Sequence, residues 1–207
     1  MINLHNMDCM EAMAQMPDNA FDLAIVDPPY GIKQHKGIRF NKQKVLHKSK
    51  DWDYRIPPKK YFEELKRVSQ YYIIWGGNYF VDYLQNSRCW LVWNKKNGGN
   101  NMSDCELAYT NFNSSVRMFS RSHIEDHNQG IQSIHPTQKP IALYTWILNK
   151  YAKKGWRILD THLGSGSSAI AAYNAGYEFV GYEIDKDYYT AAKKRLENHK
   201  RQLRMFV

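Results

Sequence analysis

The feature that most constrains the fold is an alternation of strand-like and helix-like segments from residue 139 onward. Apolar residues recur there at helical spacing, and a short apolar strand precedes each later helix. We predict helices at 139–153, 167–175 and 186–203 and strands at 157–160 and 178–183. Such alternation is typical of a parallel sheet that is covered by helices on both faces. The predicted fold class is therefore α/β, with a mostly parallel, doubly wound sheet.

The earlier part of the chain fits the same class less regularly. Residues 21–26 form a nearly continuous apolar run, as expected for a strand that is buried on both faces. We predict further strands at 71–75, at 90–94 and twice around 105–120, and helices at 8–16, at 59–70 and near 78–86. A chain of 207 residues has the size of one packed domain. We therefore expect a single domain over 1–207.

Positive charge is concentrated in one segment of the chain. Residues 31–60 contain ten Lys and Arg against two Asp and Glu, whereas residues 1–30 contain five acids and no Lys or Arg. A localised basic segment is what a polyanionic partner requires. Residues 31–58 also lack a sustained apolar period, so we interpret them as a long loop. Charge alone leaves DNA, RNA and an anionic membrane open as partners.

Several classes of protein are excluded by composition. Three cysteines without a CxxC pair exclude a disulfide framework and a four-cysteine zinc site within this chain. No apolar run approaches the roughly 20 residues that span a bilayer. The first thirty residues contain none of the Lys or Arg that a secretory signal carries. We therefore expect a cytoplasmic protein with no membrane partner and no bound metal.

A glycine-rich turn follows the strand predicted at 157–160. Residues 160–167 read Asp-Thr-His-Leu-Gly-Ser-Gly-Ser, and Glu183 ends the next predicted strand. Glycines let a ligand approach the backbone, and a carboxylate at the second strand end suits a ribose diol. The turn lacks the spacing of dinucleotide-binding and phosphate-binding loops, so a nucleoside cofactor without pyrophosphate fits better than NAD or ATP. Taken alone, a structural turn with a surface acid remains the alternative.

A second unusual strand end follows the run at 21–26. Residues 27–31 read Asp-Pro-Pro-Tyr-Gly, in which two prolines fix a rigid corner without N–H donors. Asp27 offers a carboxylate, Pro28 a backbone carbonyl and Tyr30 an aromatic face. Two acceptors beside a flat stacking surface suit the exocyclic amino group of a planar base. Taken alone, the motif is equally compatible with an ordinary turn.

These two strand ends occur together with further sequence blocks in a fixed order. The blocks are residues 6–9 (Asn-Met-Asp-Cys), 75–78 (Trp-Gly-Gly-Asn), 93–95 (Trp-Asn-Lys) and 135–140 (His-Pro-Thr-Gln-Lys-Pro). In this order the chain resembles the β-group amino-methyltransferases of DNA, which use S-adenosylmethionine and carry their motifs in circularly permuted order. The resemblance covers nearly the whole chain and implies a Rossmann-like methyltransferase fold.

The resemblance also implies a role for each matching residue. The catalytic motif would consist of Asp27, Pro28, Pro29 and Tyr30. The cofactor-binding residues would be Asp8, Cys9, Asp27, His135, Thr137, Lys139, Asp160, Leu163, Gly164, Ser165, Gly166, Ser167, Glu183 and Ile184. Among them, Asp8 and Cys9 would hold the adenine end of S-adenosylmethionine and Glu183 its ribose. Thr137 and Lys139 would face its methionine carboxylate.

The implied reaction is direct transfer of a methyl group from S-adenosylmethionine to the N6 amino group of adenine in double-stranded DNA. Adenine is favoured because Asp, rather than Ser, opens the catalytic motif in most adenine-directed relatives. Candidate recognition insertions are residues 31–58 and about 95–130. DNA contacts are expected from Lys33, Lys36, Arg39, Lys42, Lys44, Lys48 and Trp52. A homodimer is left open, and any restriction endonuclease would be a separate protein.

The chain departs from the family pattern directly after Asp160. Residues 161–163 are Thr-His-Leu where the family usually has Pro, Phe and a small residue, and Ser167 stands where Thr is frequent. Three alternatives remain beside the adenine enzyme. They are an N4-cytosine DNA methyltransferase, a catalytically silent DNA-binding protein of the same fold, and an RNA base methyltransferase.

Overall fold

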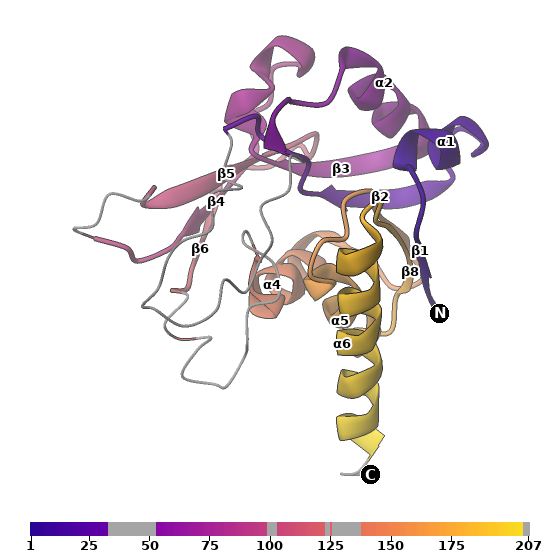
Figure 1. Cartoon of the computed structure of the whole chain (residues 1–207). Coiled ribbons are helices and arrows are strands. Elements are labelled where there is room, and N and C mark those ends of the chain that lie inside the picture. Colours follow the sequence, from indigo (N-terminus) through magenta and orange to yellow (C-terminus); the bar gives the residue numbers. More distant parts are fainter. Residues whose placement is uncertain (33–52, 99–102, 123–124, 126–137, 205–207) are drawn as a thin grey trace.

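The computed structural model describes residues 1–32, 53–98, 103–122, 125 and 138–204. This part of the chain forms an eight-stranded sheet in the order β1-β8-β7-β2-β3-β5-β4-β6 (Figure 1). The strands are β1 (Ile2–His5), β2 (Phe21–Val26), β3 (Ser69–Trp75), β4 (Trp90–Asn94), β5 (Cys105–Thr110), β6 (Arg117–Ser120), β7 (Arg157–Asp160) and β8 (Glu178–Tyr182). The helices are α1 (Cys9–Ala14), α2 (Lys59–Val68), α4 (Ile141–Tyr151), α5 (Ser167–Asn174) and α6 (Lys186–Arg204), with two 3-10 turns, η2 (Gly77–Tyr79) and η3 (Val81–Tyr83).

The sheet is mostly parallel, as the sequence predicted. β1, β8, β7, β2 and β3 are neighbours in that order, and each adjacent pair among them is parallel. Beyond β3 the direction changes, because β5 is antiparallel to both β3 and β4. The edge strand β6 is parallel to β4. The predicted α/β class with a doubly wound sheet is therefore confirmed.

Two predictions about individual elements were wrong or incomplete. The helix expected near 78–86 is a pair of short 3-10 turns, η2 and η3, which follow Gly76 in the left-handed conformation. The sequence analysis also contained no strand at the N-terminus. β1 has only four residues and alternates half-buried with exposed positions, so its pairing with β8 stabilises it more than its own sequence does.

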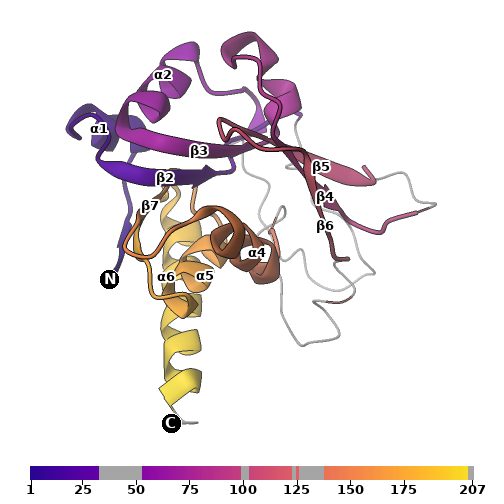
Figure 2. The ribbon, with the colours of Figure 1, turned by 180° about the vertical axis from the view of Figure 1, so that it is seen from behind.

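Helices cover both faces of the sheet and create two separate cores. α1 and α2 lie on one face, and α4, α5 and α6 lie on the other (Figures 1 and 2). In β2, Leu23 and Ile25 join the core under α4 and α5, whereas Ala24 and Val26 join the core under α1 and α2. A strand buried on both faces shows no polar alternation, which explains the continuous apolar run at 21–26.

The three cysteines are free, with Cys9 and Cys89 buried and Cys105 exposed. Within the described ranges, every helix is too short or too polar to cross a bilayer.

The central position of β2 makes it a test of the packing. Leu23 is fully buried in the core under α4 and α5, so Leu23→Ala should lower the free energy of unfolding by about 3 kcal/mol through lost burial and the cavity left behind. Val116→Ala is the control, because Val116 is 54% exposed, and surface changes usually stay within about 0.5 kcal/mol. Urea unfolding measures both values. Equal effects at the two positions would contradict the burial of β2.

Candidate active site

The parallel pairing places five strand ends in a row along one edge of the sheet. Asp8 follows β1, Glu183 follows β8, Asp160 ends β7, Asp27 follows β2 and Gly76 follows β3. Residues from both ends of the sequence therefore meet at the carboxyl edge, which is where ligands bind in open α/β sheets. The two strand ends that the sequence analysis singled out lie next to each other, because β7 and β2 are paired neighbours.

The turn after β7 is built around the buried carboxyl group of Asp160. One Asp160 oxygen accepts the backbone N–H of His162 at 3.0 Å, and the other accepts the Ser168 hydroxyl at 2.5 Å. Burial raises the pKa of Asp160 to about 7 in spite of these two donors. Gly164 and Gly166 both have positive φ angles, which let the chain turn from β7 into α5. Asp160 thus organises the predicted cofactor loop from beneath.

Glu183 connects the ends of β7 and β8. Its carboxylate accepts the backbone N–H of Gly164 at 2.9 Å and that of Asp185 at 2.9 Å. The side chain of Asn6 donates to the Glu183 carbonyl at 2.8 Å, which brings in the end of β1. Glu183 is therefore held at the position where the sequence analysis expected a ribose-binding acid.

The first turn of α1 lies beside these strand ends. Asp8 caps α1 by accepting the backbone N–H of Met10 at 2.7 Å. Burial, with the charge of Asp8, raises the pKa of the Cys9 thiol to about 12. This thiol is protonated at neutral pH, so it is no nucleophile.

The other predicted cofactor residues lie in different environments. Leu163, Ser165 and Ser167 are buried, and the two serine hydroxyls lie 3.1 Å apart. Arg195 of α6 donates to the Ser165 carbonyl and the Ser167 hydroxyl, both at 2.9 Å. Ile184, by contrast, is 69% exposed.

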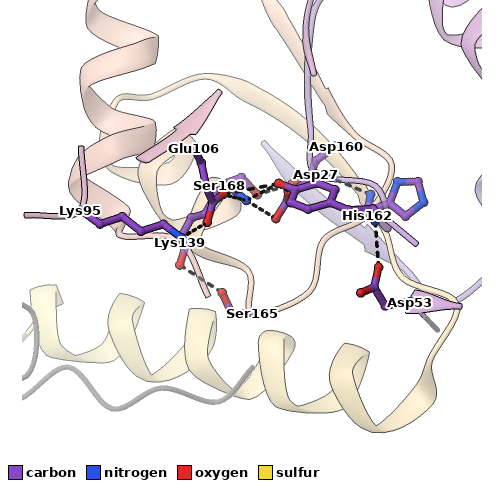
Figure 3. Close-up of polar contacts among 11 residues, drawn as sticks. Asp27, Asp53, Lys95, Glu106, Lys139, Asp160, His162, Ser165 and Ser168 are labelled. Atoms are coloured by element: carbon purple, nitrogen blue, oxygen red, sulfur yellow. Dashed lines mark hydrogen bonds and ion pairs between the residues drawn. The ribbon is translucent and has the colours of Figure 1, made fainter. Parts of the chain in front are cut away.

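The predicted catalytic motif carries a cluster of charges that the sequence analysis did not predict. Lys139 forms ion pairs with Asp27 at 2.5 Å and with Glu106 at 3.0 Å (Figure 3). Lys95 pairs with the other oxygen of Glu106 at 2.6 Å. The Tyr30 hydroxyl donates to Asp27 at 2.6 Å and accepts from Lys139 at 3.1 Å. The negative charges of Asp27 and Glu106 are thus compensated by the positive charges of Lys139 and Lys95.

The two carboxylates of this cluster differ in proton affinity. Burial raises the pKa of Asp27, and the charge of Glu106 adds to this effect while Lys139 opposes it. Burial also disfavours the charge of Glu106, but Lys139 and Lys95 together lower its pKa to about 2. Burial disfavours the charge of Lys139 as well, yet the two carboxylates raise its pKa, so Lys139 stays protonated. Asp27 is therefore the carboxylate of the pair that more readily accepts a proton.

The Tyr30 ring is held on several sides. It stacks on Tyr79 of η2 with a centroid distance of 5.0 Å and meets the edge of Phe80 at 6.1 Å. A Cβ atom at Gly76 would overlap the Tyr30 ring, and Gly76 has a φ of +72°. Any side chain at position 76 would therefore displace the ring, which explains why glycine ends β3.

Residues 161–163, where the chain departs from the family pattern, form part of a buried polar network. The Tyr61 hydroxyl of α2 lies 2.7 Å from the Thr161 hydroxyl, which lies 2.9 Å from Nδ1 of His162. Burial lowers the pKa of His162 to about 4, so the imidazole is neutral at pH 7. The Tyr61 hydroxyl thus provides a polar partner for the Thr161 hydroxyl, which in turn contacts Nδ1 of His162.

The structure identifies Glu106 and Lys95 as site residues that sequence reasoning missed as a pair. Glu106 lies at the start of β5, and Lys95 directly follows β4. Because β5 runs antiparallel to β3, its first residues reach the edge that the parallel strands reach with their last residues. Lys95 belonged to the block at residues 93–95, whereas the sequence signal for Glu106 was an acid next to the start of an apolar strand.

Some predicted site residues lie outside the described part of the chain. They are the cofactor candidates His135 and Thr137 and the DNA-contact candidates Lys33, Lys36, Arg39, Lys42, Lys44, Lys48 and Trp52.

Sequence comparisons relate this arrangement to known proteins. Residues 92–194, about half of the chain, match the N6/N4 methyltransferase family model, which is described as DNA methylase. The chain is 25% identical to the type II methyltransferase M.HpaI of Haemophilus parainfluenzae, over 92% of this chain and 73% of that protein. It is 24% identical to the putative methylase YubD of Escherichia coli, over 91% and 87% of the two chains.

Solved structures share the fold. The M1.HpyAVI–SAM complex matches with a TM-score of 0.61 at 19% identity and covers 94% of this chain and 100% of its own. TTHA0409 from Thermus thermophilus, complexed with S-adenosyl-L-methionine, matches with a TM-score of 0.60 at 18% identity, over 96% of both chains. The cytosine-N4-specific PvuII DNA methyltransferase matches with 0.59 at 12% identity, over 96% and 90%. The predicted Rossmann-like methyltransferase fold is confirmed, and residues 92–194 are similar to the N6/N4 DNA methylases.

Asp160 offers a pH test of the buried turn. Its pKa rises from the ordinary value of 3.8 to about 7, so between these values the folded chain keeps a proton that the unfolded chain releases. The contribution of Asp160 to the free energy of unfolding therefore falls as the pH rises from about 4 to 7, by at most about 1.4 kcal/mol per pH unit.

Asp160→Asn removes this titration, while its amide can still bond to His162 and Ser168. When the pH is raised from 5 to 8, the free energy of unfolding, measured with urea, should fall more in the wild type than in the variant. Parallel pH profiles of the two proteins would contradict a proton held by Asp160.

Proposed function

We propose that this chain, a relative of the N6/N4 DNA methylases, transfers a methyl group from S-adenosylmethionine to the N6 amino group of adenine in double-stranded DNA. The observation that carries the proposal is the adjacency of two strand ends. The Asp27 carboxylate follows β2, and the Asp160–Gly166 turn follows its neighbour β7. An acceptor for an amino group therefore lies beside a turn suited to a nucleoside cofactor.

The residues at the carboxyl edge fit S-adenosylmethionine by their chemistry. The acids Asp8 and Glu183 lie there, and their charge suits a cofactor with a sulfonium and an ammonium group. A carboxylate has about four acceptor sites, so Glu183 can accept ribose hydroxyls in addition to the backbone N–H groups of Gly164 and Asp185. When bound, the cofactor supplies an electrophilic methyl group.

The catalytic motif would bind and activate the amino group of the base. Its nitrogen lone pair is delocalised into the ring, which makes the amino group a poor nucleophile. Hydrogen bonds from its N–H groups to the Asp27 carboxylate and the Pro28 carbonyl favour a more tetrahedral nitrogen. Positive charge develops on this nitrogen during transfer, so preorganised acceptors stabilise the transition state more than the ground state.

The charge cluster around Asp27 supports this role. The methylated nitrogen must lose a proton, and the raised pKa of Asp27 makes its carboxylate the better acceptor of the two acids in the cluster. Lys139 is 2% exposed and bonds to Asp27, Glu106 and Tyr30. In this proposal Lys139 fixes the orientation of the Asp27 carboxylate, which makes it part of the catalytic motif.

DNA is the proposed partner because the basic segment supplies the charge that a polyanion needs. Lys33, Lys36, Arg39, Lys42, Lys44 and Lys48 would contact phosphates, and Trp52 would stack on a base or insert beside it. The target adenine must rotate out of the duplex, which costs a few kcal/mol, and stacking on an aromatic ring recovers about 1–3 kcal/mol.

The product identifies the function directly. Unmethylated duplex DNA incubated with labelled S-adenosylmethionine should yield N6-methyladenine in nucleoside mass spectrometry. N4-methylcytosine as the product would show that the target base is cytosine, and the proposed mechanism would stay the same. Product on RNA alone would reject the DNA assignment, and cofactor binding without any product would favour the silent DNA-binding protein.

Asp27→Asn tests the catalytic role. The variant retains the size of the side chain but loses the charged acceptor, so single-turnover methyl transfer should fall by about 100-fold or more. S-adenosylmethionine affinity, measured by calorimetry, should stay within about threefold. Asp82→Asn is the control, because Asp82 is an exposed acid in η3, and it should transfer at the wild-type rate. Near-normal turnover of Asp27→Asn would reject the assignment.

A further inference from the structure

Asp53 is a buried acid that the proposed reaction does not use. It is 2% exposed, and one of its oxygens, Oδ1, accepts two backbone N–H groups of the catalytic motif (Figure 3). The donors are Tyr30 at 2.8 Å and Gly31 at 2.9 Å. A carboxylate that accepts two backbone N–H groups forms strong, charge-assisted bonds and fixes the chain locally.

The composition of the motif makes these two bonds important. Residues 28 and 29 are prolines and have no N–H group. Within residues 27–31 only Asp27, Tyr30 and Gly31 can donate from the backbone, and two of these three donors end on Asp53. Asp53 therefore fixes the path of the backbone directly after β2 through two of its three available N–H donors.

The backbone on both sides of this contact is closely packed. Gly31 has a φ of +73°, and a Cβ atom there would come within 3.3 Å of the Ile56 backbone nitrogen and side chain. Residues 30–31 and residues 53–56 are therefore in contact, although residues 32–52 lie between them in the sequence. Asp53 thus joins these two parts of the chain at the catalytic motif.

Tyr30 transmits this anchoring to the reacting groups. Asp53 binds its backbone N–H, and the Tyr30 hydroxyl donates to Asp27 at 2.6 Å. The ring between these two points is held by its stack with Tyr79. A shift of the Tyr30 backbone would therefore move the hydroxyl, the Asp27 carboxylate and the preceding Pro28 carbonyl together.

We infer that Asp53 is a positioning residue for methyl transfer, which orients the Asp27 carboxylate and the Pro28 carbonyl through the backbone N–H groups of Tyr30 and Gly31. The inference rests on the proposed function. It assigns Asp53 no contact with the cofactor or the base, because the effect passes through the motif.

Two substitutions separate the hydrogen bonds from the charge. Asp53→Ala removes the acceptor, and methyl transfer should fall by about 10- to 100-fold in kcat. Asp53→Asn keeps an oxygen that can accept both bonds, since both end on the same atom, and should retain kcat within about threefold. S-adenosylmethionine affinity should stay within about threefold in both variants. Turnover is measured with unmethylated genomic duplex DNA and saturating S-adenosylmethionine.

Asp22→Ala is a matched control, because it also removes a carboxylate that accepts a backbone N–H group. One Asp22 oxygen accepts the backbone N–H of Arg157 at 2.8 Å, at the opposite end of β2. Both Ala variants should lower the melting temperature, but Asp22→Ala should keep the wild-type kcat. Equal kcat for Asp53→Ala and the wild type would overturn the inference. Equal losses in the Ala and Asn variants would also overturn it, because the charge of Asp53 would then matter rather than the two bonds.

A second measurement needs no activity. In the protein without cofactor or DNA, the backbone N–H groups of Tyr30 and Gly31 should exchange with solvent at least tenfold faster in Asp53→Ala than in the wild type. Unchanged exchange at these two amides would overturn the inference even if turnover fell. A wild type that methylates no nucleic acid would reject the proposed function, and the exchange comparison would still decide whether Asp53 holds the motif.

Discussion

Parallel pairing of neighbouring strands is the constraint on which the site depends. A parallel strand delivers its last residue to the same edge as its neighbour does, so β1, β8, β7, β2 and β3 all end at one edge. The acids that follow these strands are brought together by hydrogen bonding between backbones and need no attraction of their own. The reversed strand β5 adds Glu106 with its first residues, and β4, which runs in the same direction as β3, adds Lys95 directly after its last residue. The edge thus combines the residues predicted to bind the cofactor with the predicted catalytic motif.

The buried charges at this edge are compatible with a stable fold because they are paired with charges of opposite sign. Burying an ionised carboxylate is costly unless a partner of opposite charge and further hydrogen bonds are present. Asp27 is 18% exposed and Lys139 only 2%, so neither could stay ionised there alone. Three ion pairs connect Asp27, Lys139, Glu106 and Lys95 in this order, so negative and positive charges alternate. Lys95, the last of the four, directly follows β4. Asp160 is paired instead with the neutral donors His162 N–H and Ser168 O–H, and burial raises its pKa to about 7.

Much of the fold could be predicted from local pattern alone. The strands at 21–26, 90–94 and 157–160 have the predicted bounds, because continuous apolar runs and flanking breakers define them. β1 was missed because four residues carry too little pattern, and its stability comes from β8 at the far end of the sequence. The motif order indicated Asp27, Asp160 and Glu183 as site residues, and the structure places all three at one edge. Glu106 and Asp53 could not be found in this way, because each acts through contacts with residues far away in the sequence. Glu106 reaches Lys139 through the antiparallel strand β5, and Asp53 accepts the backbone N–H groups of Tyr30 and Gly31.

The pairing of β1 with β8 has a consequence for the order in which the protein can form. Ile2 lies opposite Phe179 and Asn3 opposite Val180, so β1 leaves the ribosome long before its partner β8 is made. During synthesis β2 and β3 can pair early, and their ends carry the catalytic motif. The glycine turn and Glu183 are made much later, and contacts of such sequence separation form slowly. The part of the edge with the predicted catalytic motif can therefore form before the part with the predicted cofactor residues, and the proposed site is incomplete until β8 has been made.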